Sequence, residues 1–147
     1  MIPSPGRGEA ETRMETKRSM PEATRSPYER LGGDGGVDSL VKHFYRRMDT
    51  LPEAAVIRAM HAEDLTPMVD KLGVFLIGWM GGPQNYTSRF GRVIIPVAHE
   101  PYRIGPDERD QWLVCMRRAL EDVEAEHGLV EELMDAFYRM AEMCRTR

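Results

Sequence analysis

One histidine stands between two prolines in the segment VIIPVAHEPYRIG, residues 93–105. Pro96 suits the start of a helix, and Pro101 keeps Glu100 out of helical backbone angles, so about one turn can form around His99. Such a turn fixes the backbone on both sides of the imidazole, which suits a ring that presents one nitrogen to a fixed point. The residues alone leave open the alternative of a histidine hydrogen-bonded within a loop.

The other chemical features exclude several classes of function. Cys115 and Cys144 are the two cysteines; they fall in helical patterns without metal-like spacing, so we expect free thiols in a reducing cytoplasm. The net charge is −4 and the basic residues are dispersed, which argues against nucleic-acid binding. The longest apolar run, residues 74–80, is too short to span a membrane.

The hydrophobic pattern predicts an all-α protein. Expected helices cover residues 36–49, with Asp34 as the cap, residues 52–60, residues 65–79, a helix that begins at Pro106, and a last helix after Gly128. Residues 83–95 lack periodicity and predict an irregular connection, which is long for a plain helical bundle. Residues 1–26 have few apolar side chains and predict a disordered tail before one domain over residues 27–147.

Five motifs occur in a fixed order along this domain. They are YERLGG at 28–33, FY at 44–45, FLIGWMGGP at 75–83, AHEPYRI at 98–104 and ERDQWLVCM at 108–116. Together they resemble the truncated haemoglobins, most closely group II. The resemblance implies a truncated globin fold, in which two helix pairs form a two-over-two sandwich around haem.

The resemblance also implies roles for particular residues. His99 matches the proximal ligand of the haem iron. Tyr45, Trp112 and His61 match polar positions on the distal side, where they stabilise a bound ligand by hydrogen bonds. Read alone, the two aromatic residues are ordinary core residues and His61 is a surface histidine. The positions implied to contact the cofactor are Phe44, Met68, Lys71, Leu72, Phe75, Tyr86, Tyr102 and Met116.

One segment departs from the family pattern. Group II chains typically carry arginines before the proximal ligand, whereas Ile94, Pro96 and Ala98 stand at those positions here. Arg92 and Arg103 do not obviously restore the lost charge. We therefore expect haem to be held mainly by iron ligation and apolar packing, with weaker anchoring of its propionates. The apolar run is equally suited to the proximal wall or to a protein interface.

The leading hypothesis from the sequence is a cytoplasmic protein that holds haem b with its iron and reversibly binds dioxygen, carbon monoxide or nitric oxide. The resemblance assigns no catalytic residue, but it leaves open nitric oxide dioxygenase-like or peroxidase-like chemistry with an external reductase. Nucleic-acid and membrane partners are not expected, and a homodimer is left open. The alternative is a globin-like sensor or interaction domain with weakened or lost haem binding.

Overall fold

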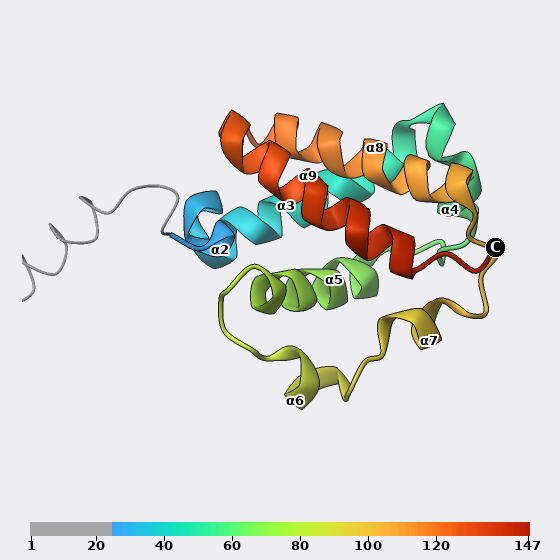
Figure 1. Cartoon of the computed structure of the whole chain (residues 1–147), viewed down its shortest axis with the longest axis horizontal. Helices are drawn as coiled ribbons and strands as arrows, with labels where there is room; N and C mark the ends of the chain where they lie inside the picture. The colour runs from blue at the N-terminus through green and yellow to red at the C-terminus, as the bar shows by residue number, and fades with distance from the viewer. Residues whose placement is uncertain (1–24) are drawn as a thin grey trace, which may run out of the picture.

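The computed structural model of the chain describes residues 25–147 (Figure 1). The expected tail over residues 1–26 therefore lies almost wholly outside the described residues. In the described part the elements are, in chain order, α2 (Pro27–Leu31), α3 (Gly33–Thr50), the 3-10 turn η2 (Pro52–Ala54), α4 (Ala55–Ala59), α5 (Thr66–Trp79), α6 (Tyr86–Phe90), α7 (Ile95–His99), α8 (Pro106–Asp122) and α9 (His127–Met143). Residues 25–147 contain no strand, which confirms the all-α prediction. None of these helices is long and apolar enough to cross a membrane.

Helix α3 is the centre of the core. Its apolar residues recur every three or four positions, so they form one continuous face. Leu40, Val41 and Phe44 on this face have no exposed surface, and Met48 is 1% exposed. The same helix packs against both α5 and α8.

Helices α8 and α9 run side by side and make the second pair (Figure 1). A short connection joins them, as is usual for neighbouring antiparallel helices. The buried ring of Phe137 on α9 links the two pairs, because its centroid lies 4.8 Å from Trp79 of α5 and 5.4 Å from Trp112 of α8. The four long helices thus form the predicted sandwich of α3 with α5 and α8 with α9.

Helices α6 and α7 form a separate arm below α5 in Figure 1, and we call residues 86–99 the proximal arm. Neither helix has a buried residue. α6 contacts α5 through the rings of Phe75 and Tyr86, whose centroids are 5.7 Å apart. α7 is not closely packed against any other described helix. The proximal arm is therefore held by few contacts.

Two details of the expected helices were wrong. Asp34 does not cap the helix: Gly32 adopts the left-handed conformation (φ 106°), so α3 begins at Gly33, and Asp34 accepts a hydrogen bond of 2.7 Å from the Tyr28 hydroxyl. Residues 83–95 are not wholly irregular, because they include α6. α2 was not predicted; it is stabilised by Ser26, whose hydroxyl accepts the backbone N–H of Glu29.

Candidate functional site

His99 lies at the end of α7 and is half-buried. The predicted single turn is confirmed, with Pro96 as its second residue. The expected effect of Pro101 was wrong, because Glu100 before it keeps helical backbone angles (φ −52°, ψ −38°). The Nδ1 atom of His99 is 2.7 Å from the carbonyl oxygen of Ile95. Because a carbonyl only accepts hydrogen bonds, Nδ1 carries the proton, and in the neutral ring Nε2 keeps its lone pair. A backbone carbonyl commonly orients metal-ligating histidines in this way.

Tyr45, Trp112 and His61 come together in one cluster of rings. Tyr45 lies on α3, Trp112 on α8, and His61 follows α4. The Phe44 ring touches both neighbours, with its centroid 5.0 Å from that of Tyr45 and 5.0 Å from that of Trp112. The His61 ring lies edge-on to Tyr45 at 6.0 Å. The structure thus gathers the three predicted distal residues from three parts of the chain.

Tyr45 and Trp112 are donors without protein acceptors. Tyr45 is only 5% exposed, yet neither its hydroxyl nor the indole N–H of Trp112 has a hydrogen-bond partner among residues 25–147. Burial raises the pKa of Tyr45 far above its usual value, so its hydroxyl stays protonated. Neither atom is among the fully buried polar atoms without a partner in residues 25–147, so both donors keep some accessible surface that a bound molecule could cover. The pair therefore points to a ligand that accepts hydrogen bonds.

His61 has one fixed nitrogen and one available nitrogen. Its Nδ1 donates to the carbonyl oxygen of Ile57 at 2.7 Å, so Nε2 can accept a hydrogen bond, or donate one when the ring is protonated. The same ring lines a hollow of about 570 Å³ at the corner between α3 and α4. His61 therefore lies between this hollow and the ring of Tyr45.

Helix α5 carries apolar side chains that the fold covers only in part. It is more apolar than α3, α8 or α9, but only Gly73 and Leu76 on it are buried. The three apolar residues of α5 that were predicted to contact haem are half-buried at the edge of the core, namely Met68, Leu72 and Phe75. On the proximal arm, Ile94 and Val97 are 55% and 53% exposed. Half-covered apolar side chains on both elements suit a large, flat, apolar cofactor.

The remaining predicted contact residues differ in their surroundings. Phe44 and Met116 have no exposed surface, whereas Tyr102 follows the proximal arm and is 45% exposed. Tyr86 is half-buried with its ring against Phe75. The ring contacts of the distal cluster do not include His99 or Tyr102. Contact of these residues with a cofactor stays a prediction.

Three basic residues near the proximal arm have no carboxylate partner. Lys71, Arg92 and Arg103 form no ion pair within residues 25–147, whereas Arg89 is paired with Asp70 at 2.7 Å. The Nζ atom of Lys71 lies 5.8 Å from the centroid of the Phe90 ring. Lys71 is among the positions that the resemblance implied to contact the cofactor, and an ammonium without a carboxylate partner in residues 25–147 suits a carboxylate of that cofactor.

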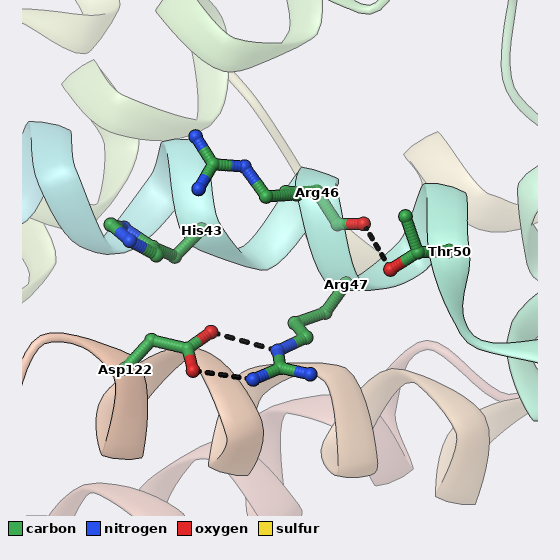
Figure 2. Close-up of a pocket in the computed structure, with 5 residues that line it drawn as sticks. All are labelled: His43, Arg46, Arg47, Thr50 and Asp122. Carbon is green, nitrogen blue, oxygen red and sulfur yellow. Dashed lines mark hydrogen bonds and ion pairs between the residues drawn. The ribbon is translucent and has the colours of Figure 1, made fainter.

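A second hollow, of about 280 Å³, lies between α3 and α8, away from the distal cluster of Tyr45, Trp112 and His61 (Figure 2). Arg47 donates two hydrogen bonds to Asp122, from Nε at 2.8 Å and Nη2 at 2.5 Å, and holds the pKa of that carboxyl below its usual range. His43 and Arg46 complete the basic side of the hollow. None of these residues was predicted for the site, and the charge pair serves to join α3 to α8.

The sequence profile of the bacterial-like globin family matches residues 26–146. The chain belongs to this family. The globin is 31% identical over 115 residues to a group 2 truncated hemoglobin of Bacillus subtilis, in an alignment that covers 78% of this chain and 83% of the relative.

Solved structures of truncated haemoglobins superpose on most of this globin. A group II 2-on-2 hemoglobin from Agrobacterium tumefaciens is 38% identical, with a TM-score of 0.79 over 86% of this chain and 98% of its own. A cold-adapted truncated hemoglobin from Pseudoalteromonas haloplanktis is 32% identical, with a TM-score of 0.80 over 84% of this chain and 99% of its own. The globin is thus a group II truncated haemoglobin, as the five motifs indicated.

Membership of this family implies a haem-binding globin, and the residues present fit that cofactor. A histidine with its Nδ1 hydrogen-bonded to a backbone carbonyl offers a ligand nitrogen. Half-covered apolar side chains on α5 and the proximal arm offer the hydrophobic contacts that a porphyrin needs. Tyr45 and Trp112 offer donors that residues 25–147 do not use.

Proposed function

We propose that this globin binds haem b through His99 and holds a diatomic gas, dioxygen first of all, beside Tyr45, Trp112 and His61. The observation that carries the proposal is the hydroxyl of Tyr45, a residue only 5% exposed, which has no acceptor in residues 25–147 but is not sealed inside the core. Haem iron supplies the site at which a diatomic gas coordinates. The chain supplies its ligand nitrogen, the hydrogen bonds and the exclusion of water.

The distal residues favour a ligand that carries partial negative charge. Dioxygen on ferrous haem carries such charge, and donors held among apolar rings stabilise it more than donors in water do. Phe44 contacts both Tyr45 and Trp112, so the two donors are fixed before a ligand arrives. If each hydrogen bond contributes about 1–2 kcal/mol, each slows ligand dissociation by roughly tenfold.

The proximal residues fix the direction of one nitrogen. The Ile95 carbonyl accepts the Nδ1 proton of His99, so the ring presents Nε2 as the ligand atom. Pro96 limits the rotation of the backbone that carries this ring. His99 is proposed as the iron ligand on these grounds.

A spectrum of the purified chain after haem loading tests the proposal. We expect a Soret band, and we expect His99→Gly to lose the spectrum of histidine-ligated haem and to regain it when imidazole is added. His43→Gly is the matched control, because its Nδ1 also lies near a backbone carbonyl one turn earlier, at 2.9 Å, but on the far side of α3. The absence of a Soret band would contradict the haem assignment and favour the alternative of a sensor or interaction domain. A band that His99→Gly leaves unchanged would contradict the assignment of His99 as the ligand.

The proposal includes a reducing, cytoplasmic location, which is supported by two free thiols. Cys115 is buried, which raises its pKa to about 11, and Cys144 is half-buried. Binding of carbon monoxide or nitric oxide, redox turnover with an external reductase, and a homodimer stay predictions.

A further inference from the structure

The connection between α7 and α8 is fastened by the last two residues of the sequence. Thr146 accepts the backbone N–H of Ile104 on its Oγ1 at 2.9 Å and donates the same hydroxyl to the carbonyl oxygen of Tyr102 at 2.6 Å. The backbone N–H groups of Thr146 and Arg147 both donate to the carbonyl oxygen of Ile104, at 2.8 Å and 3.2 Å. We call these four hydrogen bonds, with the ion pair described next, the clasp.

The ion pair of the clasp joins Arg147 to Glu108, at 2.5 Å between Nη2 and Oε1. Glu108 is the buried charged residue of the described chain, at 5% exposure, and its Oε1 also accepts the backbone N–H of Gly105 at 3.2 Å. A buried carboxylate is stable only when it is paired and hydrogen-bonded, so Glu108 holds Arg147 in place. A Cβ atom at Gly105 would lie 2.9 Å from the Nε atom of Arg147, so a glycine here leaves room for the Arg147 side chain.

A direct chain of hydrogen bonds connects the clasp to His99. The backbone N–H of Tyr102 donates to the carbonyl oxygen of His99 at 3.0 Å, and the Tyr102 carbonyl accepts from Thr146. One residue, Tyr102, therefore links the residue proposed to bind iron to the Thr146 hydroxyl. On the other side of the same connection begins α8, which carries Trp112.

The weak attachment of the proximal arm makes these bonds important. α6 and α7 have no buried residue, and α7 is not closely packed against another described helix. At the α6 end the arm is held by the Arg89–Asp70 ion pair and by ring contacts of Tyr86. At the His99 end, the clasp ties the connection to residues 146–147, which follow α9, and through Glu108 to α8.

We propose that Thr146 and Arg147 are positioning residues, which fix the connection after α7 and through it the direction of the His99 ring. The inference rests on the proposed function, in which His99 is the haem ligand. It predicts that the bond between His99 and the iron depends on two residues more than forty positions away in the sequence.

The test uses the full chain, both haem-free and loaded with haem. The variants are Thr146→Val, which keeps the shape but removes the hydroxyl, Thr146→Ser, which keeps the hydroxyl, and Arg147→Gln. Arg117→Gln is the control, because Arg117 also forms an ion pair across helices, with Glu131 at 3.2 Å, but away from the clasp. Two measurements are made: backbone hydrogen exchange of peptides covering residues 95–105, and the iron–histidine stretching band of the ferrous protein by resonance Raman spectroscopy.

We expect Thr146→Val to speed exchange of the Ile104 amide by roughly tenfold in both forms, and to shift or broaden the iron–histidine band. Arg147→Gln should act in the same direction, whereas Thr146→Ser and Arg117→Gln should behave as the unchanged chain. Faster exchange with an unmoved band would overturn the inference, because the clasp would then be structural only. Unchanged exchange would overturn it as well.

The two proposals fail in different ways. If the unchanged chain shows no iron–histidine band that depends on His99, the proposed function fails and the positioning role falls with it. If that band is present but Thr146→Val leaves it unmoved, the inference alone is wrong.

Discussion

Replacing Tyr45 by Phe should have opposite effects on the stability of the haem-free protein and on the retention of a bound gas. The hydroxyl has no hydrogen-bond partner in residues 25–147, and its side chain is 5% exposed, so its removal breaks no described bond and leaves the ring contacts intact. A wholly buried hydroxyl without an acceptor costs on the order of 1–3 kcal/mol; the Tyr45 hydroxyl is not wholly buried, so it carries only part of that cost, which is recovered when the hydroxyl is removed. We expect the haem-free Tyr45→Phe variant to be more stable, by up to about 1 kcal/mol.

Ligand binding should change in the opposite direction. In the haem-loaded protein the lost hydrogen bond of about 1–2 kcal/mol should speed dioxygen dissociation by roughly tenfold. Urea unfolding measures the first effect and stopped-flow displacement of dioxygen the second. Tyr138→Phe is the control, because this side chain is 46% exposed on α9, and it should change neither quantity. A Tyr45→Phe variant that is destabilised, or that releases dioxygen at the original rate, would refute the reasoning.

Two further predictions concern the core and the clasp. Phe137→Ala removes a fully buried ring that touches Trp79 and Trp112. The substitution should lower the free energy of unfolding, measured by urea titration, by about 3–5 kcal/mol. A loss below about 1 kcal/mol would show that the pair of α3 and α5 is not joined to the pair of α8 and α9 through this ring. The Arg147 guanidinium, with the Gly105 N–H, holds the pKa of Glu108 below its usual range. This pair therefore contributes stability above the unfolded-state pKa, about 4.3, that is lost as the pH falls through the lower folded value. Glu108→Gln should make the acid limb of a urea-midpoint curve shallower, and an unchanged slope would speak against the pair.

Residue periodicity predicted the parts of the fold that depend on local pattern. The stripes of α3, α5, α8 and α9 are long enough to identify each helix, and the prolines around His99 correctly indicated a single turn. α2 and α6 are too short to show a period. They depend on contacts made far along the chain, such as the Tyr28 N–H to the Met80 carbonyl oxygen and the ring of Tyr86 against Phe75.

The site was predictable to the extent that its motifs resemble a family. Tyr45 and Trp112 were named from the motifs that carry them, and the structure brings their rings together through Phe44. The clasp had no such signal, because it joins residues far apart in the sequence, 146–147 to 102–108, and part of it is made by backbone groups, which every residue possesses. The one local hint was the spacing of Gly105, Pro106 and Glu108, which is typical of a helix start with a carboxylate that reaches back.

The positions of the two tryptophans determine which part of the molecule intrinsic fluorescence can follow. The sequence has two tryptophans, and both rings lie against the same partner, Phe137. Intrinsic tryptophan fluorescence therefore observes the junction of α5, α8 and α9. The proximal arm contains no tryptophan, so detachment of His99 from the helical body leaves both emitters in their original surroundings. Unfolding curves recorded by fluorescence will therefore follow the helical sandwich and not the proximal arm. Opening of the proximal arm has to be measured by hydrogen exchange.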